Sequence, residues 1–389
     1  MKIVHLCLCG SYNDNWGYQD NIIPKYNKKD GHDVTVITSV FKNSTKHEGY
    51  EKVEPGEYYL DNGVKVIRIP FKRIFIDKIS EKLRIYEGLY KRLQEEKPDV
   101  IFVHGIQFWD IRTVIIYKRE HPNVKIFADN HADYINSARN FFSKYILHKV
   151  IWKLGVKKFI PYCEKIFGVT PNRCDFLIKM YNVPKDKIDF LVMGADVEKI
   201  DFAHKEEIRK RIRRNLSLAD DDFVLITGGK IDKHKNIHHL MQAVNEIADE
   251  KLKLVIFGTP SEEYKDIFED LSSTPFIRKI GWIATDEVYN YYLASDMAVF
   301  PGRHSVLWEQ AVGTGLPCIF KKWEGQTHVD VGGNCIFIEN GTKEEIKSAI
   351  KSVLIDREKY NKMLKVAQER GIILFSYENI SRRAIGQVY

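Results

Sequence analysis

Short apolar runs alternate with longer amphipathic segments along the chain. Runs typical of buried strands occupy residues 2–9, 33–39, 64–69, 99–104, 124–128, 165–169 and 188–193 in the first half, and 222–227, 252–257, 277–280, 297–300, 317–320 and 335–338 in the second. Because segments long enough for a helix separate most of these runs, the pattern predicts βαβ units and parallel sheets.

The clearest helical period begins after Asn236, a residue type that is favoured as a helix N-cap. Apolar side chains then recur at the i, i+3, i+4, i+7 spacing of one helix face. They are Ile237, Leu240, Met241, Val244, Ile247 and Ala248. A second helix is predicted over 343–355.

A chain of 389 residues is longer than one hydrophobic core usually serves, so two domains are expected. We predict an α/β protein with two facing Rossmann-like, doubly wound domains, over 1–200 and 201–370. The hinge is placed near 196–204, because the charged stretch 204–215 has few apolar residues to tie it to a core. Parallel sheets bind ligands at the carboxyl ends of their strands, so the active site is expected in the cleft between the domains.

Composition disfavours several classes of protein. With 44% hydrophobic and 29% charged residues the chain is typical of folded soluble domains. No apolar run reaches the roughly 20 residues of a membrane span, and the N-terminus enters a strand without a cleavable signal. The six cysteines lack paired C-x-x-C spacing, so we expect no zinc site and a reducing cytoplasm. The chain lacks a G-x-G-x-x-G motif, which disfavours an NAD-dependent oxidoreductase. It also lacks a recognised nucleic-acid-binding module.

Lysines gather in the stretch 228–240, GGKIDKHKNIHHL, which opens the predicted helix. Lys230, Lys233 and Lys235 lie near the positive end of a helix dipole, where cations are disfavoured unless an anion is bound. The residues alone leave two interpretations open, a diphosphate site or a solvated lysine-rich loop.

A second stretch, 299–317, runs VFPGRHSVLWEQAVGTGLP. A strand ends at Phe300, a Pro-Gly turn follows, and Glu309 lies early in the next helix. A glutamate in a first turn is favourable for structural reasons alone. The functional alternative is that Glu309 points into the crevice and accepts hydrogen bonds from a vicinal diol such as ribose.

Together the two stretches resemble the retaining GT-B glycosyltransferases of family 4. That family has a G-[RK]-x4-K segment, matched by Gly229-Lys230…Lys235, and a later glutamate segment ending in G-x-P, matched by Glu309…Gly315-Leu316-Pro317. Gly17 in the loop after the first strand, the segment 31–34 and the segment 194–196 also fit the family. Residues 371–389 are similar to its C-terminal helix, which packs back on the first domain.

The resemblance implies roles for individual residues. Lys230 and Lys235 would bind and stabilise the leaving diphosphate, and Glu309 would hold the ribose. The segment Gly281-Trp282-Ile283 would contact the base, and Gly17 would let the backbone approach the donor. His131, in a turn after a strand, matches a family histidine near the reacting centre, although a lone loop histidine is more often structural.

One position departs from the family. The first glutamate of its motif would fall eight residues before Glu309, where this chain has Pro301. We expect Ser305, Val306 and Leu307 to offer backbone N–H groups to phosphate. His304 or Arg303 is the hypothetical replacement for the missing glutamate.

The reaction that the resemblance implies is a front-face displacement with retention, which transfers a sugar from a nucleotide-diphosphate sugar to a glycan or lipid-linked acceptor. Of the possible nucleotides, UDP is the first expectation. No metal and no other cofactor is expected, and Asp220-Asp221-Asp222 is interpreted as a solvated turn. We expect a role in surface polysaccharide or glycoconjugate biosynthesis.

The segment 134–163 contains six Lys/Arg, no acidic residue and several aromatic residues. This composition suits contact with anionic headgroups, and it also suits aromatic side chains in a core with solvated lysines. If the first interpretation holds, the protein is cytoplasmic and peripheral on the inner face of the cell membrane.

Other functions remain open at this point. A sugar-nucleotide epimerase would share the scaffold, and the missing glutamate leaves room for a non-catalytic nucleotide-binding protein. The net charge of +7 keeps a basic nucleic-acid-binding protein as a further alternative, although we expect no nucleic-acid partner.

Overall fold

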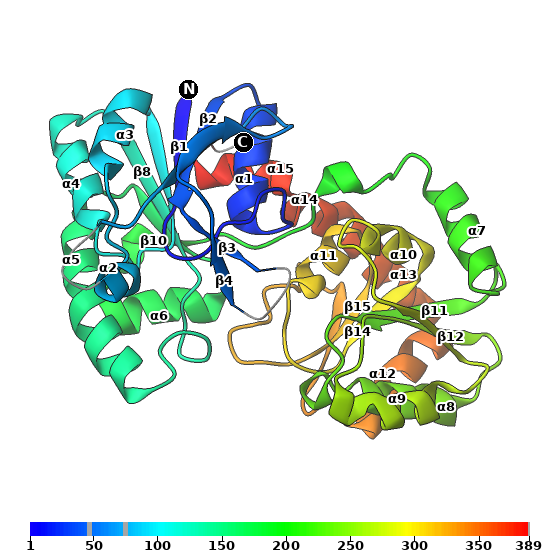
Figure 1. Cartoon of the computed structure of the whole chain (residues 1–389). Coiled ribbons are helices and arrows are strands. Elements are labelled where there is room, and N and C mark those ends of the chain that lie inside the picture. The colour runs from blue at the N-terminus through cyan, green and yellow to red at the C-terminus, as the bar shows by residue number, and fades with distance from the viewer. Residues whose placement is uncertain (45–48, 73–76, 388–389) are drawn as a thin grey trace. The chain divides into compact units, whose positions relative to one another are not determined.

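The computed structural model describes residues 1–44, 49–72 and 77–387. The chain forms two compact units, the first made of Met1–Val192 with Ile380–Tyr389, the second of Met193–Asn379 (Figure 1). The second unit thus begins a few residues before the boundary placed at 200.

The first unit is built on a sheet of eight strands in the order β10-β9-β8-β7-β1-β2-β6-β5. Its strands are β1 (Lys2–Cys7), β2 (Asp33–Ser39), β5 (Gly56–Tyr59), β6 (Lys65–Ile69), β7 (Val100–His104), β8 (Lys125–Asn130), β9 (Lys165–Gly168) and β10 (Ile188–Phe190). All neighbours are parallel except β5 and β6. Central strands such as VIFVH in β7 are buried along their whole length, because helices cover both faces of a parallel sheet.

The helices of this unit follow the strands in βα alternation. They are α1 (Gln19–Lys29), α2 (Asp77–Leu83), α3 (Leu89–Glu96), α4 (Ile111–Glu120), η1 (Phe142–Trp152, a π-helix), α5 (Lys153–Phe159), η2 (Ile160–Tyr162), α6 (Pro171–Tyr181) and η3 (Lys185–Lys187). The sequence pattern did not predict β5, nor the short hairpin of β3 (Phe41–Asn43) and β4 (Tyr50–Lys52). These strands are three or four residues long and partly exposed, so they carry little hydrophobic pattern.

The second unit contains a fully parallel sheet in the order β13-β12-β11-β14-β15-β16. Its strands are β11 (Phe223–Gly228), β12 (Leu252–Phe257), β13 (Ile277–Gly281), β14 (Met297–Phe300), β15 (Cys318–Lys321) and β16 (Cys335–Ile338). Numbered from β11, this order is the 3-2-1-4-5-6 arrangement of a Rossmann domain, in which ligands bind where the order reverses. The predicted parallel sheets are therefore confirmed, and the reversal lies between β11 and β14.

The helices of the second unit are η4 (Val197–Lys199), α7 (Lys205–Asn215), η5 (Lys233–Lys235), α8 (Ile237–Ile247), η6 (Glu262–Tyr264), α9 (Lys265–Ser272), α10 (Val288–Ala294), α11 (Leu307–Gly313), α12 (Lys343–Ile355), α13 (Arg357–Val366), η7 (Ala367–Gly371) and α14 (Ile372–Leu374). The stripe predicted for α8 is buried at Ile237, Leu240, Met241 and Val244, whereas Ala248 lies just past the helix end in a left-handed conformation.

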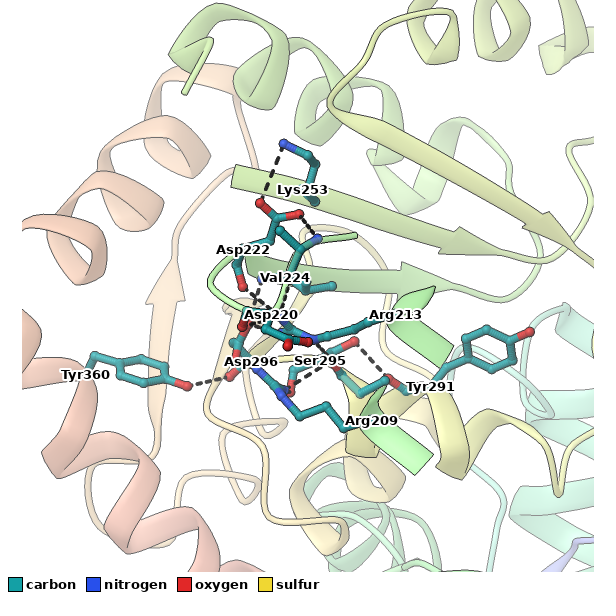
Figure 2. A network of polar contacts seen from close by, with 12 residues as sticks. Arg209, Arg213, Asp220, Asp222, Val224, Lys253, Tyr291, Ser295, Asp296 and Tyr360 are labelled. Atoms are coloured by element: carbon teal, nitrogen blue, oxygen red, sulfur yellow. Dashed lines mark hydrogen bonds and ion pairs between the residues drawn. The ribbon is translucent and has the colours of Figure 1, made fainter. Parts of the chain in front are cut away.

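The charged segment before β11 is tied to the second unit by arginines as well as by the buried side chains of Ile208 and Ile212 (Figure 2). Arg209 and Arg213 on α7 bind the two carboxylate oxygens of Asp296 at 2.7 and 2.8 Å. The same carboxylate accepts a hydrogen bond from the Val224 backbone N–H, and the Tyr360 hydroxyl donates to the Asp296 carbonyl oxygen. The small number of apolar residues in this segment gave no sign of these polar contacts.

The prediction of a solvated Asp220–Asp222 turn was correct only in part. Asp220 and Asp221 are exposed, but Asp222 is buried and its carboxylate accepts from the Ala219 backbone N–H at 2.8 Å. Arg213 donates to the carbonyl oxygens of Ala219, Asp220 and Asp222, so this turn is held in place by a buried guanidinium.

The end of the chain returns to the first unit within helix α15 (Tyr377–Ala384). Arg382 makes two hydrogen bonds to the carboxylate of Asp30, and the Ser381 carbonyl oxygen accepts from the Asn27 side chain. Figure 1 shows α15 beside α1. Within the described residues no helix is long and apolar enough to cross a bilayer, and all six cysteines are free thiols.

Candidate functional site

A groove of about 400 Å³ lies at the carboxyl ends of β11, β12 and β13. It is lined by Gly229, Lys230, Phe257, Gly258, Thr259, Trp282, Ile283, Thr285, Val288 and Leu307. Five of the predicted donor-binding residues are among them. The volume is within the range of small-molecule sites, and the walls are apolar with one ammonium group available.

Gly229 allows two loops to meet at the floor of this groove. Its φ is +102°, and a Cβ atom there would approach the Leu307 side chain to 2.9 Å. A larger residue would therefore have a strained backbone and would displace the Leu307 side chain. The glycine is required by the backbone as much as by any ligand.

The two motif loops, far apart in sequence, are joined directly. The Lys235 ammonium donates to the Arg303 carbonyl oxygen at 2.9 Å, and the Arg303 N–H donates to the His234 carbonyl oxygen. Burial lowers the pKa of Lys235. Its ammonium has three donors, so two remain for a ligand after the contact with Arg303.

Asn236 stands at the N-cap position of α8, but its side chain does not cap the helix. It has a left-handed backbone with φ of +54°, and its amide donates to the Pro301 carbonyl oxygen at 3.0 Å. The predicted capping role was wrong in this respect. The side chain holds the turn after β14 against the start of α8.

Glu309 is fully buried and is not among the residues that line this groove. Its Oε1 atom receives hydrogen bonds from His304 Nε2 at 2.8 Å and from His328 Nε2 at 2.9 Å, and these rings cover it. Burial by itself would raise the pKa of Glu309, but the two histidines outweigh it and hold the pKa well below its usual range. The Oε2 atom has no hydrogen-bond partner among the described residues.

The ligand atoms of His304, Glu309 and His328 lie within 4.8 Å of one another, as in a site that can hold a metal ion. Tetrahedral zinc bonds of about 2.0–2.1 Å would separate two ligand atoms by about 3.3 Å. The nitrogen–oxygen distances of 2.8 and 2.9 Å are those of hydrogen bonds. The cluster is accordingly interpreted as a hydrogen-bonded carboxylate.

The turn between β14 and α11 keeps its polar groups available. Among the described residues, the N–H groups of Ser305, Val306 and Leu307 make no hydrogen bond to the protein, and the buried Ser305 hydroxyl has no partner. Trp323 donates from its indole to the Gly302 carbonyl oxygen at 3.0 Å, which fixes the other end of the turn. A fixed turn with free donors is suited to an anion.

Two predicted residues belong to the first unit. Gly17 lies exposed in a bend before α1. His131 follows β8, its side chain is 42% exposed, and its Nε2 atom lies 3.2 Å from the Asp129 carboxylate. Asp129 and Asn130, predicted as part of the turn, are the last residues of β8 and are fully buried. Burial by itself would raise the pKa of Asp129, but His131 and His104 outweigh it and hold the pKa well below its usual range.

Sequence reasoning missed several residues that the structure brings to these places. His328 lies between β15 and β16, and His104 and His5 lie inside strands, where a histidine in an apolar run gives no functional signal. Phe257 is the last residue of β12, and Thr259 lies two positions beyond it. The rule that ligands gather at the carboxyl ends of parallel strands would have found these two.

Some side chains of the segment 134–163 fit one of the two interpretations left open by its composition, and others fit the second. Trp152 and Phe159 are buried in the core, as the structural alternative requires. Tyr134 and Ile135 are exposed ahead of the helices. Along the helices the exposed apolar side chains are Phe141 (73%), Phe142 (48%), Tyr145 (39%), Ile146 (40%), Val150 (48%) and Leu154 (55%). Because their spacing follows one face of η1 and α5, they form an exposed apolar strip flanked by lysines.

Two Rossmann-like units, one carrying a groove with a lysine and glycines at the carboxyl ends of its strands, define a nucleotide-dependent transferase fold. The family model for Glycosyltransferase Family 4 matches residues 25–199, and that for Glycosyl transferases group 1 matches residues 208–370. The two matches together take in most of the chain, and the protein belongs to this glycosyltransferase family.

Individual relatives agree with this assignment. An uncharacterized glycosyltransferase of Methanocaldococcus jannaschii is 22% identical over 92% of this chain and 89% of its own. The alpha-monoglucosyldiacylglycerol synthase of Acholeplasma laidlawii is 21% identical over 82% of this chain and 80% of its own. A solved structure of Anabaena HepE in complex with UDP and glucose has a TM-score of 0.63 at 14% identity, covering 98% of both chains, which shows the same fold.

Proposed function

We propose that this glycosyltransferase moves a sugar, with retention, from a UDP-sugar to a glycan or lipid-linked acceptor. The observation that carries the donor assignment is the groove at the carboxyl ends of β11–β13, lined by Gly229, Lys230 and Trp282. The base would lie against Trp282 and Ile283. The diphosphate would lie near Lys230, Lys235 and the free N–H groups of 305–307. A solved structure of the same fold is a complex with UDP and glucose, which supports the choice of nucleotide.

The chemistry assigned to these groups is electrostatic. As the bond to the diphosphate breaks, negative charge grows on the leaving group, and fixed cations and N–H dipoles stabilise it. The acceptor hydroxyl attacks from the same face, and a phosphate oxygen takes its proton. No step in this scheme needs a metal ion. The first unit is proposed as the acceptor side and the second as the donor side, and Gly17 and His131 of the first unit are assigned to the donor sugar at the reacting centre.

Glu309 keeps the role of ribose ligand in a modified form. The histidines occupy Oε1, so the unpaired Oε2 is the acceptor left for a hydroxyl. His304 has a side chain 16% exposed whereas His328 has 2%, so a ligand reaches Glu309 from the side of His304.

The donor assignment is tested with UDP-, GDP- and ADP-sugars in a thermal-shift panel, followed by NMR of the product anomer. Lys230→Ala should weaken UDP binding about 10–100-fold, the value of a charge-assisted hydrogen bond. Lys233→Ala is the matched control, because Lys233 is an exposed lysine of the same loop that does not line the groove. Equal loss in both variants contradicts the site. A free 2-epimer formed without acceptor favours an epimerase.

We also propose that the acceptor is presented by an anionic membrane. The observation is the exposed apolar strip of η1 and α5, which carries Lys149, Lys157 and Lys158 and no acidic residue. Side chains of this kind enter the interface while lysines meet lipid phosphates. The protein would then work at the cytoplasmic face, on a lipid-linked acceptor, in glycolipid or surface-polysaccharide synthesis. A glycolipid synthase among the relatives is consistent with this.

Vesicle flotation tests the membrane proposal. The protein should float with phosphatidylglycerol vesicles and remain below with phosphatidylcholine alone. The double variant Phe141→Ser and Leu154→Ser should abolish flotation. Ile116→Ser is the control, since Ile116 is 49% exposed on α4, outside the strip. Flotation that survives the double variant removes the strip from the proposal.

A further inference from the structure

A continuous chain of polar side chains crosses the sheet of the first unit. Asn27 Oδ1 lies 3.0 Å from His5 Nε2, and His5 Nδ1 lies 3.0 Å from His104 Nε2. His104 Nδ1 lies 3.2 Å from the Asp129 carboxylate, which also faces His131. The residues come from α1, β1, β7 and β8, and only His131 is substantially exposed. None of these contacts was predicted from the sequence.

The direction of the hydrogen bonds is set at one end by Asn27. Its Nδ2 atom donates to the Ser381 carbonyl oxygen at 3.3 Å, so its Oδ1 atom must be the one that faces His5. An amide oxygen only accepts, and His5 Nε2 therefore carries a proton. Burial lowers the pKa of His5 well below its ordinary value, which keeps the ring neutral. The other nitrogen, Nδ1, is then an acceptor.

His104 is consequently placed between two acceptors. Its Nε2 atom must donate to His5 Nδ1, and its Nδ1 atom faces the carboxylate of Asp129, which is ionised and only accepts. Both nitrogens of His104 thus face acceptors, an arrangement that an imidazolium ring satisfies. Its charge offsets that of Asp129, whose other oxygen accepts from the Gly105 backbone N–H at 2.8 Å.

We propose that His104 is a permanently charged positioning residue that keeps His131 neutral. With the charge of Asp129 already compensated, His131 donates from Nε2 to Asp129, and its Nδ1 lone pair is left to accept a hydrogen bond. Among the described residues Nδ1 makes no hydrogen bond. Asp20, at the start of α1, is the other acidic group near these rings, and burial raises its pKa.

This inference rests on the proposed function for one consequence, the class of substrate. A lone pair that points outward accepts from a sugar hydroxyl and repels a carboxylate. The site is thereby suited to a neutral sugar instead of a uronic acid. A UDP-hexose should be used at least about tenfold more efficiently than the corresponding UDP-uronic acid.

The charge is measured by NMR of protein with ¹⁵N-labelled histidine at about pH 8, where an ordinary imidazole is neutral. His104 should show two protonated nitrogens and His131 one. His148 is an internal reference: it is buried, it contacts Ser137 and Tyr181 outside the chain of side chains, and burial lowers its pKa to about 4. It should be neutral throughout.

The Asn27→Leu variant changes the direction of the hydrogen bonds between these side chains and leaves His104 itself in place. With no acceptor at Nε2, His5 turns to the tautomer that donates from Nδ1, and His104 becomes neutral while keeping its bond to Asp129. The charge is then expected on His131. His104→Asn is the second variant, because asparagine keeps a donor near Asp129 without the charge. This variant should reduce the ratio between the efficiencies with the UDP-hexose and with the UDP-uronic acid. Loss of packing alone would not change that ratio.

A neutral His104 in the wild-type protein, or a charged His104 that Asn27→Leu leaves unchanged, overturns the proposal. The NMR measurement needs no donor sugar. If no sugar nucleotide is turned over while His104 is doubly protonated, the proposed function fails and the charge assignment stands.

Discussion

Asp129 in the first unit and Glu309 in the second are both fully buried, and each is approached by two histidine nitrogens. They differ at the remaining oxygen. Asp129 Oδ1 accepts from the Gly105 N–H, whereas Glu309 Oε2 has no partner among the described residues. An unpaired buried acceptor costs about 1–3 kcal/mol, which a ligand hydroxyl can relieve. The first carboxylate is complete within the protein, and the second is prepared for a ligand.

The largest difference between the two carboxylates is expected when Asp129 is neutralised. In Asp129→Asn an amide NH₂ faces the N–H groups of two histidines, and the His104 charge loses its partner. We expect the free energy of unfolding to fall by about 3–5 kcal/mol, the cost of leaving a buried charge unpaired. Urea unfolding followed by circular dichroism measures it. Asp175→Asn, which removes an exposed pair with Lys179, should change stability by less than about 1 kcal/mol. Similar losses in both variants would mean that Asp129 is not a buried structural charge.

The next largest effect is expected on ligand binding in the second unit. Glu309→Gln keeps the size of the side chain but weakens both histidine contacts and replaces one acceptor by a donor. UDP affinity should fall about 10–100-fold, corresponding to about 1.5–3 kcal/mol for a hydrogen bond with a charged partner. Isothermal titration calorimetry with UDP measures the change. An affinity equal to that of the wild type would remove Glu309 from the ribose site and leave it a structural residue.

Acid should act on both units in the same direction. The pKa values of Asp129 and Glu309 are depressed in the folded protein, so their contribution is complete above the unfolded values of about 4 and is lost as the pH falls toward the folded ones. Each proton adds a slope of about 1.4 kcal/mol per pH unit. Denaturation between about pH 5 and 3 should therefore show a flatter dependence in Glu309→Gln than in the wild type. Parallel curves would show that Glu309 titrates alike in both states.

The smallest effect distinguishes the two candidates for the missing family glutamate. His304 contacts Glu309, whereas Arg303 is exposed and contributes its backbone to Lys235 and His234. His304→Ala should lower kcat/KM for the donor about fivefold, near 1 kcal/mol, and Arg303→Ala should leave it within about twofold. Unchanged turnover in both variants would show that neither residue replaces the glutamate at Pro301.

Much of the fold was readable from the chain because buried parallel strands leave continuous apolar runs. Apart from β5, the strands of both large sheets were predicted at nearly their observed places, and the amphipathic period identified α8. The hydrophobic pattern did not predict the contacts between buried polar side chains. Arg213 is buried on a charged helix because Asp296 and four carbonyl oxygens surround its guanidinium. Two of these partners, Asp296 and the Ala294 carbonyl, come from more than 80 positions along the chain.

The candidate site shows the same division. Lys230, Gly229 and Trp282 could be named from local motifs because each lies just after a strand that ends at the groove. Glu309 was named for the right helix, but its burial was not foreseen. His328 reaches it from nineteen positions along the chain, a contact that no local spacing predicts.

The sequence by itself determined the two α/β units, the order of their strands along the chain and the class of chemistry, since hydrophobic period and loop residues act over a few neighbouring positions. Tertiary structure alone decided which way a hydrogen bond points and which carboxylate is satisfied. Those properties depend on atoms from separate strands meeting at about 3 Å, as Asn27, His5, His104 and Asp129 do. Protonation in the buried site follows from that geometry and from no single stretch of the chain.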